Sequence, residues 1–114
     1  MQRDDLVYVG HILDTAVRAV EKIRGTTRPE FDADDNLRLA LAHLIQILGE
    51  AARRVSPQFR DAHPEIPWRA IIGMRHRVVH EYLHVDFDIV WDVVTSDLAP
   101  LITALRKIVP PASS

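Results

Sequence analysis

An arginine, two histidines and a tyrosine fall within eight residues of the chain: Arg75, His76, His80 and Tyr82. A guanidinium stays charged and offers phosphate oxygens a planar fork of donors, whereas a histidine titrates near neutrality and can take or give a proton. RNA cleavage needs a proton removed from the 2′-OH, charge stabilised on phosphorus and a proton given to the leaving 5′-oxygen. Neither proton transfer requires a metal, so these residues predict a reaction without metal or cofactor.

The segment 68–82 is predicted to be an amphipathic helix, because its apolar residues recur at helical spacing: Trp68, Ile71, Ile72, Val78, Val79 and Tyr82. Arg75 falls in the same stripe, and a charged group on a buried face normally has a partner or a task. On one helix, Arg75 and His80 would lie about 140° apart and about 7.5 Å along the axis, which does not close a site. Two copies crossing at a two-fold axis would bring both pairs into one cleft, so we expect a homodimer.

The rest of the chain predicts an all-α fold, an antiparallel bundle of four main helices plus one short helix. The main helices are expected over about 4–25, 35–55, 68–82 and 86–109, the short one opens at Ser56-Pro57, and 25–34 is a loop. Further expectations concern single positions: a helix cap at Asp4 or Asp5, a core or edge place for His43, a close helix approach at Gly49, and a kink near Asp97 caused by Pro100.

Length and composition indicate one domain over residues 1–109, followed by a disordered tail at 110–114. The chain has no cysteine, no apolar run of the roughly 20 residues that span a bilayer, and no signal peptide, so we expect a cytoplasmic protein without membrane contact. The net charge of −2 is unevenly distributed, since residues 53–80 carry six arginines against two acidic residues. This excess favours a local anion site, although scattered surface arginines would give the same count.

The spacing Arg75-x4-His80-x-Tyr82 resembles the signature of HepT-like toxins, in the HEPN superfamily of α-helical ribonucleases. Other parts of residues 4–109 resemble that family as well: Leu48-Gly49-Glu50-Ala51, Arg54-Val55-Ser56, the run from His63 to Trp68, Ile72-Gly73-Met74-Arg75 and Val90-Trp91. The position after the motif arginine departs from the pattern, because family members often have asparagine where this chain has His76.

The resemblance implies an HEPN-like domain that acts as the toxin of a type VII-like toxin–antitoxin system. It would be a metal-independent RNA endonuclease with Arg75 and His80 catalytic in a homodimer cleft, and His76 and Arg77 would support the RNA phosphate. The implied partner is a minimal nucleotidyltransferase antitoxin, which would silence the toxin by adenylylating Tyr82. The chain lacks the paired aspartates of such a transferase, so the partner would be a separate polypeptide.

Three alternatives remain at the level of sequence. The polar residues of segment 68–82 could be a hydrogen-bonded patch of an ordinary bundle. His76, His80 and His84 stand four apart and could form a metal stripe on a helix, although helical zinc sites usually recruit a further ligand. The main functional rival is a non-catalytic HEPN module that binds a nucleotide or a protein, in which His80 would be replaceable.

Overall fold

The computed structural model describes residues 3–81 and 84–109, and most of them are helical. The main helices are α1 (Arg3–Ile23), α3 (Asp35–Arg54), α5 (Trp68–Val78) and a final interrupted helix made of α6 (Phe87–Asp92), the π-helical segment η1 (Val93–Asp97) and α7 (Leu98–Arg106). Two short helices and a small hairpin join them: α2 (Arg28–Ala33), α4 (Pro57–Ala62), β1 (Val79–Glu81) and β2 (His84–Val85). The predicted all-α bundle is confirmed, whereas the predicted tail at 110–114 lies outside the described residues.

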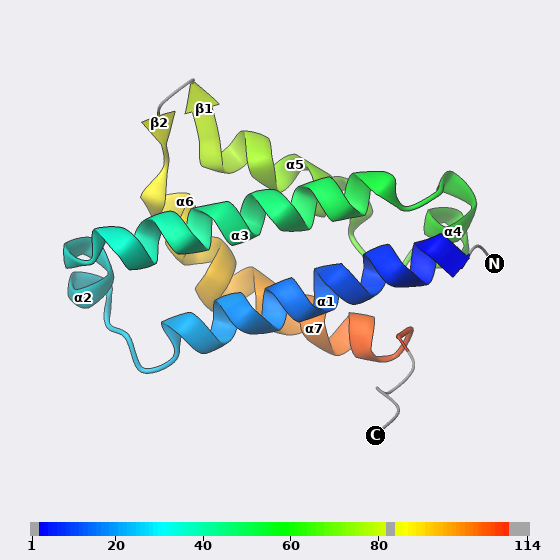
Figure 1. Ribbon diagram of the computed structural model, residues 1–114, viewed down its shortest axis with the longest axis horizontal. Coiled ribbons are helices and arrows are strands. Elements are labelled where there is room, and N and C mark those ends of the chain that lie inside the picture. The colour runs from blue at the N-terminus through cyan, green and yellow to red at the C-terminus, as the bar shows by residue number, and fades with distance from the viewer. Residues whose placement is uncertain (1–2, 82–83, 110–114) are drawn as a thin grey trace.

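The four main helices pack side by side in a flattened bundle. Figure 1 shows α1 and α3 running in opposite directions along each other, with α5 against α3 and α7 against α1. The hairpin projects from one edge of the bundle at the end of α5 (Figure 1). In the described ranges, no helix is both long and apolar enough to cross a lipid bilayer.

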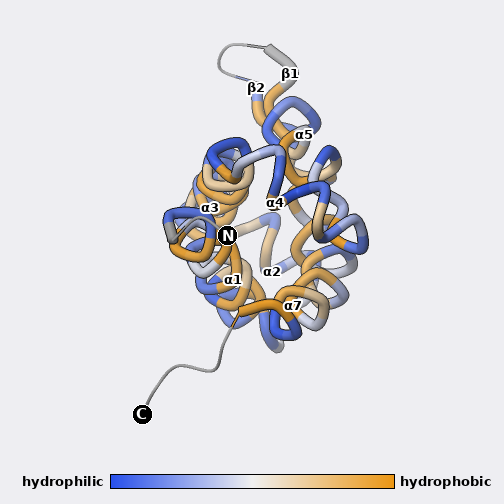
Figure 2. The backbone as a smooth tube through the Cα atoms, turned by 90° about the vertical axis from the view of Figure 1, so that its right-hand side faces the viewer, coloured by the Kyte–Doolittle hydropathy of each residue, from blue (hydrophilic) through white to orange (hydrophobic). Residues whose placement is uncertain are grey.

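The core lies between the helices, and much of the apolar sequence in Figure 2 turns inward while polar stretches lie outside. Its largest fully buried side chains come from every main helix, from α2 and from the α4–α5 connection: Ile12, Phe31, Leu41, Ile45, Leu48, Ile66, Ile71, Leu98 and Leu105. Burying such a side chain contributes about 1.5–3 kcal/mol, so this interior is what holds α5 in position.

The predicted loop at 25–34 is wrong over part of its length, because residues 28–33 form α2. Thr27 caps this helix through Glu30, and the backbone N–H of Thr27 donates in return to the Glu30 carboxylate at 2.9 Å. This reciprocal capping box is visible in the sequence, and a proline in the first helical turn supports it. Burial of Phe31 against Trp91, with ring centroids 5.2 Å apart, then docks α2 on α6.

Two single-residue expectations also need correction. Asp5 does not cap α1 but lies inside it, 3% exposed, where its carboxylate accepts the backbone N–H of Ser56 at 2.8 Å and the Ser56 hydroxyl at 2.7 Å. It thereby ties α1 to the start of α4, whose cap is Ser56 as predicted. His43 is exposed on α3, because its neighbours Leu44 and Ile45 turn to the core instead.

The interruption of the last helix was predicted, and the structure shows its form. Pro100 has no N–H to donate to Ser96, and its ring crowds that carbonyl. The five residues ending at Asp97 accommodate this as a π-helical turn, after which α7 continues to Arg106. Asp86 caps the helix at its other end, as predicted, by accepting the N–H of Ile89 at 3.2 Å.

Candidate active site at the end of helix α5

Helix α5 carries the motif arginine and is shorter than predicted. It buries Trp68, Ile71, Met74 and Val78 and ends at Val78, so the predicted helix over 68–82 is wrong at residues 79–81, which form β1. The chain continues as β1, with the β-branched Val79 as the first extended residue. The backbone N–H of Val79 donates to the carbonyl of Arg75, which closes the helix at its last turn.

The sequence pattern placed Arg75 in the apolar stripe of the helix. In the structure its side chain is exposed instead. The buried face is set by Met74 and Val78, and this phase turns Arg75 to the edge of α5 that borders α3. The two helices approach closely there, since a Cβ placed on Gly49 would lie 3.3 Å from the carbonyl oxygen of Ile71 and 3.9 Å from the Cβ of Arg75. The predicted close approach at Gly49 is therefore confirmed, and it fixes the backbone position from which the arginine projects.

His80 lies on β1 and not on the helix, so the helical angle expected between Arg75 and His80 does not apply. In the hairpin, Val79 pairs with Val85 and Glu81 pairs with His84, which leaves His80 as the extra residue of a bulge in β1. Bulges bend a strand and re-aim side chains, and they are over-represented next to active sites. Tyr82 lies outside the described residues.

The hairpin is anchored to the helix by its backbone. The N–H of Asp86 donates to the carbonyl of Val78 at 2.6 Å, so the chain returns to the end of α5 directly after β2. The carbonyls of Arg75 and Val78 are thus both used where the helix becomes a strand. This boundary falls inside the motif, between its arginine and its histidine.

The neighbouring charged residues differ in their pairing. Arg77 lies 3.6 Å from the carboxylate of Asp97 on η1, with both side chains about half exposed. Within the described part of the chain, the Arg75 side chain makes no hydrogen bond or ion pair, and that of its exposed neighbour His76 makes none either. Among the described side chains, none therefore competes with an anion for Arg75, whereas Arg77 would first have to leave a weak surface pair.

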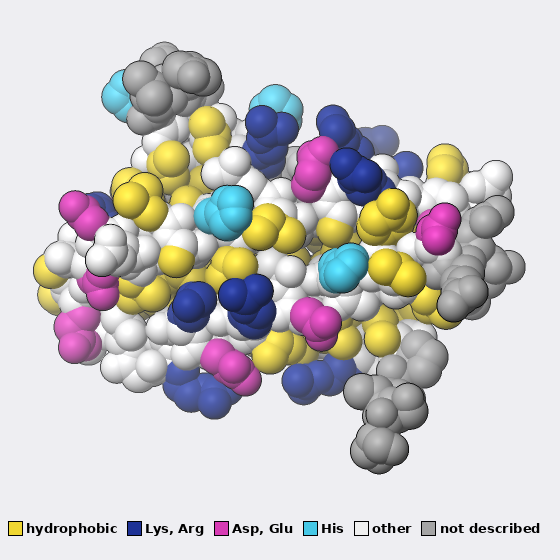
Figure 3. All heavy atoms as spheres, in the orientation of Figure 1, with side chains coloured by type: hydrophobic (Ala, Val, Ile, Leu, Met, Phe, Trp, Pro, Cys, Tyr) yellow, Lys and Arg dark blue, Asp and Glu magenta, His cyan; other side chains and the backbone are white. Residues whose placement is uncertain are grey.

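The basic excess of residues 53–80 becomes a surface feature in three dimensions. In Figure 3, Lys and Arg side chains gather along the upper edge of the molecule, over α5 and the C-terminal half of α3. Arg53 there is paired with Glu50 at 2.9 Å, both on α3. Basic side chains thus gather on this edge in Figure 3, and the anion site expected there stays a prediction.

The predicted histidine stripe does not form on a helix, because His80 and His84 lie on the two strands of the hairpin. Among the described side chains, no group of three or more histidine and acidic residues is arranged to hold a metal ion.

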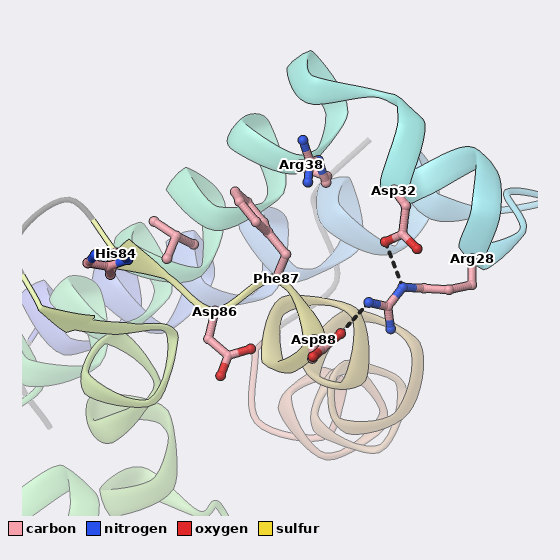
Figure 4. A pocket seen from close by; sticks show the side chains of 8 residues that line it. Arg28, Asp32, Arg38, His84, Asp86, Phe87 and Asp88 are labelled. Atoms are coloured by element: carbon pink, nitrogen blue, oxygen red, sulfur yellow. Dashed lines mark hydrogen bonds and ion pairs between the residues drawn. The ribbon is translucent and has the colours of Figure 1, made fainter.

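Sequence reasoning missed a charged hollow of about 440 Å³ beside the hairpin, shown in Figure 4. Arg28 of α2 pairs there with Asp32 at 2.8 Å and with Asp88 of α6, and these hydrogen bonds raise the pKa of the guanidinium. Arg38 stands over the ring of Phe87, 4.6 Å from its centroid. The two carboxylates already satisfy Arg28, so this hollow offers less free positive charge than the edge formed by α5.

Known proteins resemble the chain over most of its length. The family model described as ribonuclease HepT-like matches residues 13–108. A protein of Caldanaerobacter subterraneus subsp. tengcongensis, named "Putative RNase", is 31% identical over 89% of this chain and 90% of its own length. "Probable ribonuclease HepT" of Thermococcus cleftensis is 32% identical over 84% of this chain and 91% of its own length. A Methanocaldococcus jannaschii protein named "Putative RNase" is 29% identical over 85% of this chain and 89% of its own length. No solved structure matches the chain. The family match and these relatives place the chain in the HepT-like family of ribonucleases.

Proposed function

We propose that this chain is an RNA endonuclease and the toxin of a toxin–antitoxin pair, with Arg75 and His80 as its catalytic residues. One observation carries the assignment. The motif arginine is exposed in the last turn of α5 and its side chain has no partner among the described residues, and the motif histidine follows as the extra residue of a bulge. Membership of a ribonuclease family supplies the reaction class.

In the proposed reaction, a histidine removes the proton from the 2′-OH, and the 2′-oxygen attacks the adjacent phosphorus. Arg75 donates to the non-bridging oxygens, where negative charge increases in the transition state. The bond from phosphorus to the 5′-oxygen then breaks, and a protonated group gives that oxygen a proton. The products are a 2′,3′-cyclic phosphate and a free 5′-OH. Every step uses proton transfer and charge stabilisation by side chains, so we propose that the reaction is metal-independent.

The proposed dimer supplies the second group that this reaction needs. One histidine takes a proton while another gives one, and a two-fold axis beside the hairpin would place His80 of two copies in one cleft. The apolar stripe of α5 gives no separate reason for a dimer, because the helix buries that stripe in its own bundle. Within a single chain, the exposed His76 is the competing second group.

We further propose that a separate minimal nucleotidyltransferase silences the toxin by adenylylating Tyr82, two residues after His80. The modification would add a negatively charged phosphodiester that competes with RNA for Arg75. Tyr82→Phe should therefore stay toxic and escape enzymatic silencing. Full neutralisation of that variant by the partner, without nucleotide transfer, would show that inhibition is by binding alone.

Single substitutions test the catalytic assignment. Arg75→Ala and His80→Ala should each abolish cleavage of a fluorescent RNA and relieve growth toxicity. Both variants should keep the far-UV circular dichroism spectrum of the parent chain, which shows that they remain folded. Arg18→Ala, which removes an exposed arginine of α1, is the control and should keep most of the activity, as should His76→Asn. Cleavage should persist in EDTA. Activity retained by His80→Ala would favour the non-catalytic binding module instead.

The oligomeric state needs its own measurement. Light scattering at micromolar concentration should give twice the monomer mass of 13.0 kDa. When His80→Ala is mixed into the parent chain, activity should fall faster than the fraction of parent chain, because a mixed dimer keeps one His80 and cannot make both proton transfers. A monomer that cleaves RNA at full rate would assign the second proton transfer to the same chain.

A further inference from the structure

A second basic feature lies in a surface pocket between α4 and the start of α5, where Arg69 precedes the motif arginine by six residues, about 9 Å along the helix axis. The pocket has a volume of about 520 Å³. Arg60 of α4 and Arg69 of α5 both line it, together with Asp61, the apolar Ile72 and two prolines, Pro57 and Pro64. Two guanidiniums against one carboxylate leave the pocket with an excess of positive charge.

The pocket is held rigid by aromatic packing beneath it. The Phe59 ring lies 4.5 Å from that of His63 and 6.2 Å from that of Trp68, measured between centroids. The indole N–H of Trp68 donates to the carbonyl of His63 at 2.9 Å. Since Phe59 and Trp68 are also buried, α4 cannot shift relative to α5 without breaking this cluster. The two arginines therefore project from a fixed frame.

The guanidinium of Arg60 is not fully hydrogen-bonded within the described part of the chain. Its side-chain Nε is buried and has no hydrogen-bond partner in the described part of the chain. Arg38 has a buried Nε in the same condition, but its terminal nitrogen is paired with Asp35. Neither Arg60 nor Arg69 forms an ion pair within the described ranges, although Asp61 lines the same pocket. The terminal nitrogens of the two guanidiniums are therefore the donors that an anion in the pocket would engage.

The pocket adjoins the candidate active site through one shared residue. Ile72 forms part of its wall, and Arg75 and His76 are the residues three and four positions further along the same helix. Residues at these spacings are neighbours on a helix surface, one turn or about 5.4 Å further along the axis. An RNA strand that reaches Arg75 can therefore place an adjacent part of its backbone in the pocket.

We propose that the α4–α5 pocket is a phosphate subsite for RNA, in which Arg60 and Arg69 bind a backbone phosphate next to the one that is cleaved. The inference rests on the proposed ribonuclease function and extends its site to a longer substrate. The guanidiniums donate to phosphate oxygens, and Ile72 with the prolines contacts the sugar. A phosphate contact of this kind positions the strand without reading its sequence, so the subsite contributes affinity and register and takes no part in proton transfer.

The binding test uses the full chain with His80→Ala to prevent cleavage, and a fluorescent 12-nucleotide RNA as the probe. Arg60→Gln and Arg69→Gln should each raise Kd, by about 3–10-fold at low salt. The slope of log K against log salt should fall by about 0.7 for the lost contact. Arg18→Gln, which removes an exposed arginine of α1, is the matched control and should change neither quantity. Asp61→Asn should tighten binding.

The cleavage test uses the active chain on two substrates. On the long RNA, both variants should raise KM and leave kcat nearly unchanged, whereas cleavage of a dinucleotide, too short to reach the pocket, should be unaffected. Unchanged KM and salt slope in both variants, with a wild-type chain that binds and cleaves RNA, would refute the subsite alone. A wild-type chain that neither binds nor cleaves RNA would refute the ribonuclease proposal and the subsite together. Loss of nucleotidyltransferase binding with unaltered RNA binding would assign the pocket to the protein partner and overturn the inference.

Discussion

Gly49 offers a quantitative test of how α3 positions the motif arginine. Replacing a helical glycine by alanine normally stabilises a helix by up to about 1 kcal/mol. At Gly49, however, the new Cβ would meet backbone carbonyl oxygens of α5 at 3.3 Å and 3.5 Å, which are held by that helix and cannot rotate away. Overpacking of this kind costs about 1 kcal/mol at the lower end of its range, so the two effects should nearly cancel.

Two other glycines provide matched controls. A Cβ added at Gly10 of α1 or at Gly73 of α5 would meet no atom within 4 Å, so Gly10→Ala and Gly73→Ala should keep most of the propensity gain, roughly 0.5–1 kcal/mol. Gly49→Ala should fall about 1 kcal/mol below them, a difference of roughly 4 °C in Tm for a chain of this size. Gly49→Val adds two further methyl groups and should lose about 2–3 kcal/mol.

The assay is urea unfolding followed by circular dichroism at 222 nm, at one fixed protein concentration because association would add to the apparent stability. Cleavage of RNA by Gly49→Val, measured where the chain is still folded, should fall as well, since α5 must move and Arg75 moves with it. If Gly49→Ala stabilises the chain as much as Gly10→Ala does, the close contact between α3 and α5 does not constrain the site, and this reasoning is refuted.

Two further predictions concern the ends of helices. Asp5→Ala should destabilise the chain by about 2–3 kcal/mol in the same unfolding assay, because it removes both carboxylate oxygens that accept hydrogen bonds from Ser56. A loss below about 0.5 kcal/mol would show that these hydrogen bonds do not stabilise the fold. Hydrogen bonds from the backbone and side chain of Thr27 lower the pKa of Glu30, so the capping box should stabilise α2 above the ordinary glutamate pKa and weaken as pH falls through the lowered value. The protection of the α2 amides against hydrogen exchange, taken relative to the intrinsic exchange rate at each pH, should fall over that acid range in the parent chain and stay constant in Glu30→Gln.

Several features of the fold could be predicted because local chemistry decides them. Ser56 and Asp86 are caps in the structure as in the prediction, and Pro100 interrupts the last helix where its missing N–H demands it. Gly49 indicated a close approach because glycine in a helix interior is otherwise unfavourable. Each of these inferences needs only a residue and its neighbours within one turn.

Other features depend on contacts that a periodic pattern does not contain. Asp5 has the residue type of a helix cap, and only the position of Ser56, 51 residues later, makes it a buried acceptor instead. The short α2 is too brief to stand alone and exists because Phe31 docks on Trp91. Arg75 matched the apolar stripe by heptad spacing, but Met74 fills the core and the guanidinium remains in solvent.

The end of α5 was the least predictable feature and matters most for the site. Val78, Val79 and Tyr82 continue the helical periodicity, yet β-branched residues fit a strand equally well, and pairing with residues 84–85 decides between the two. Because the helix stops between Arg75 and His80, their relative placement is set by two backbone hydrogen bonds, from Val79 to Arg75 and from Asp86 to Val78, and not by helical geometry. In this chain, the R-x4-H spacing therefore describes three consecutive features: a helix that carries the arginine, the end of that helix, and a bulge that carries the histidine. Five residues within one uninterrupted helix would direct the arginine and the histidine to different faces, whereas a chain that turns after Val78 is free to aim the histidine independently of the arginine.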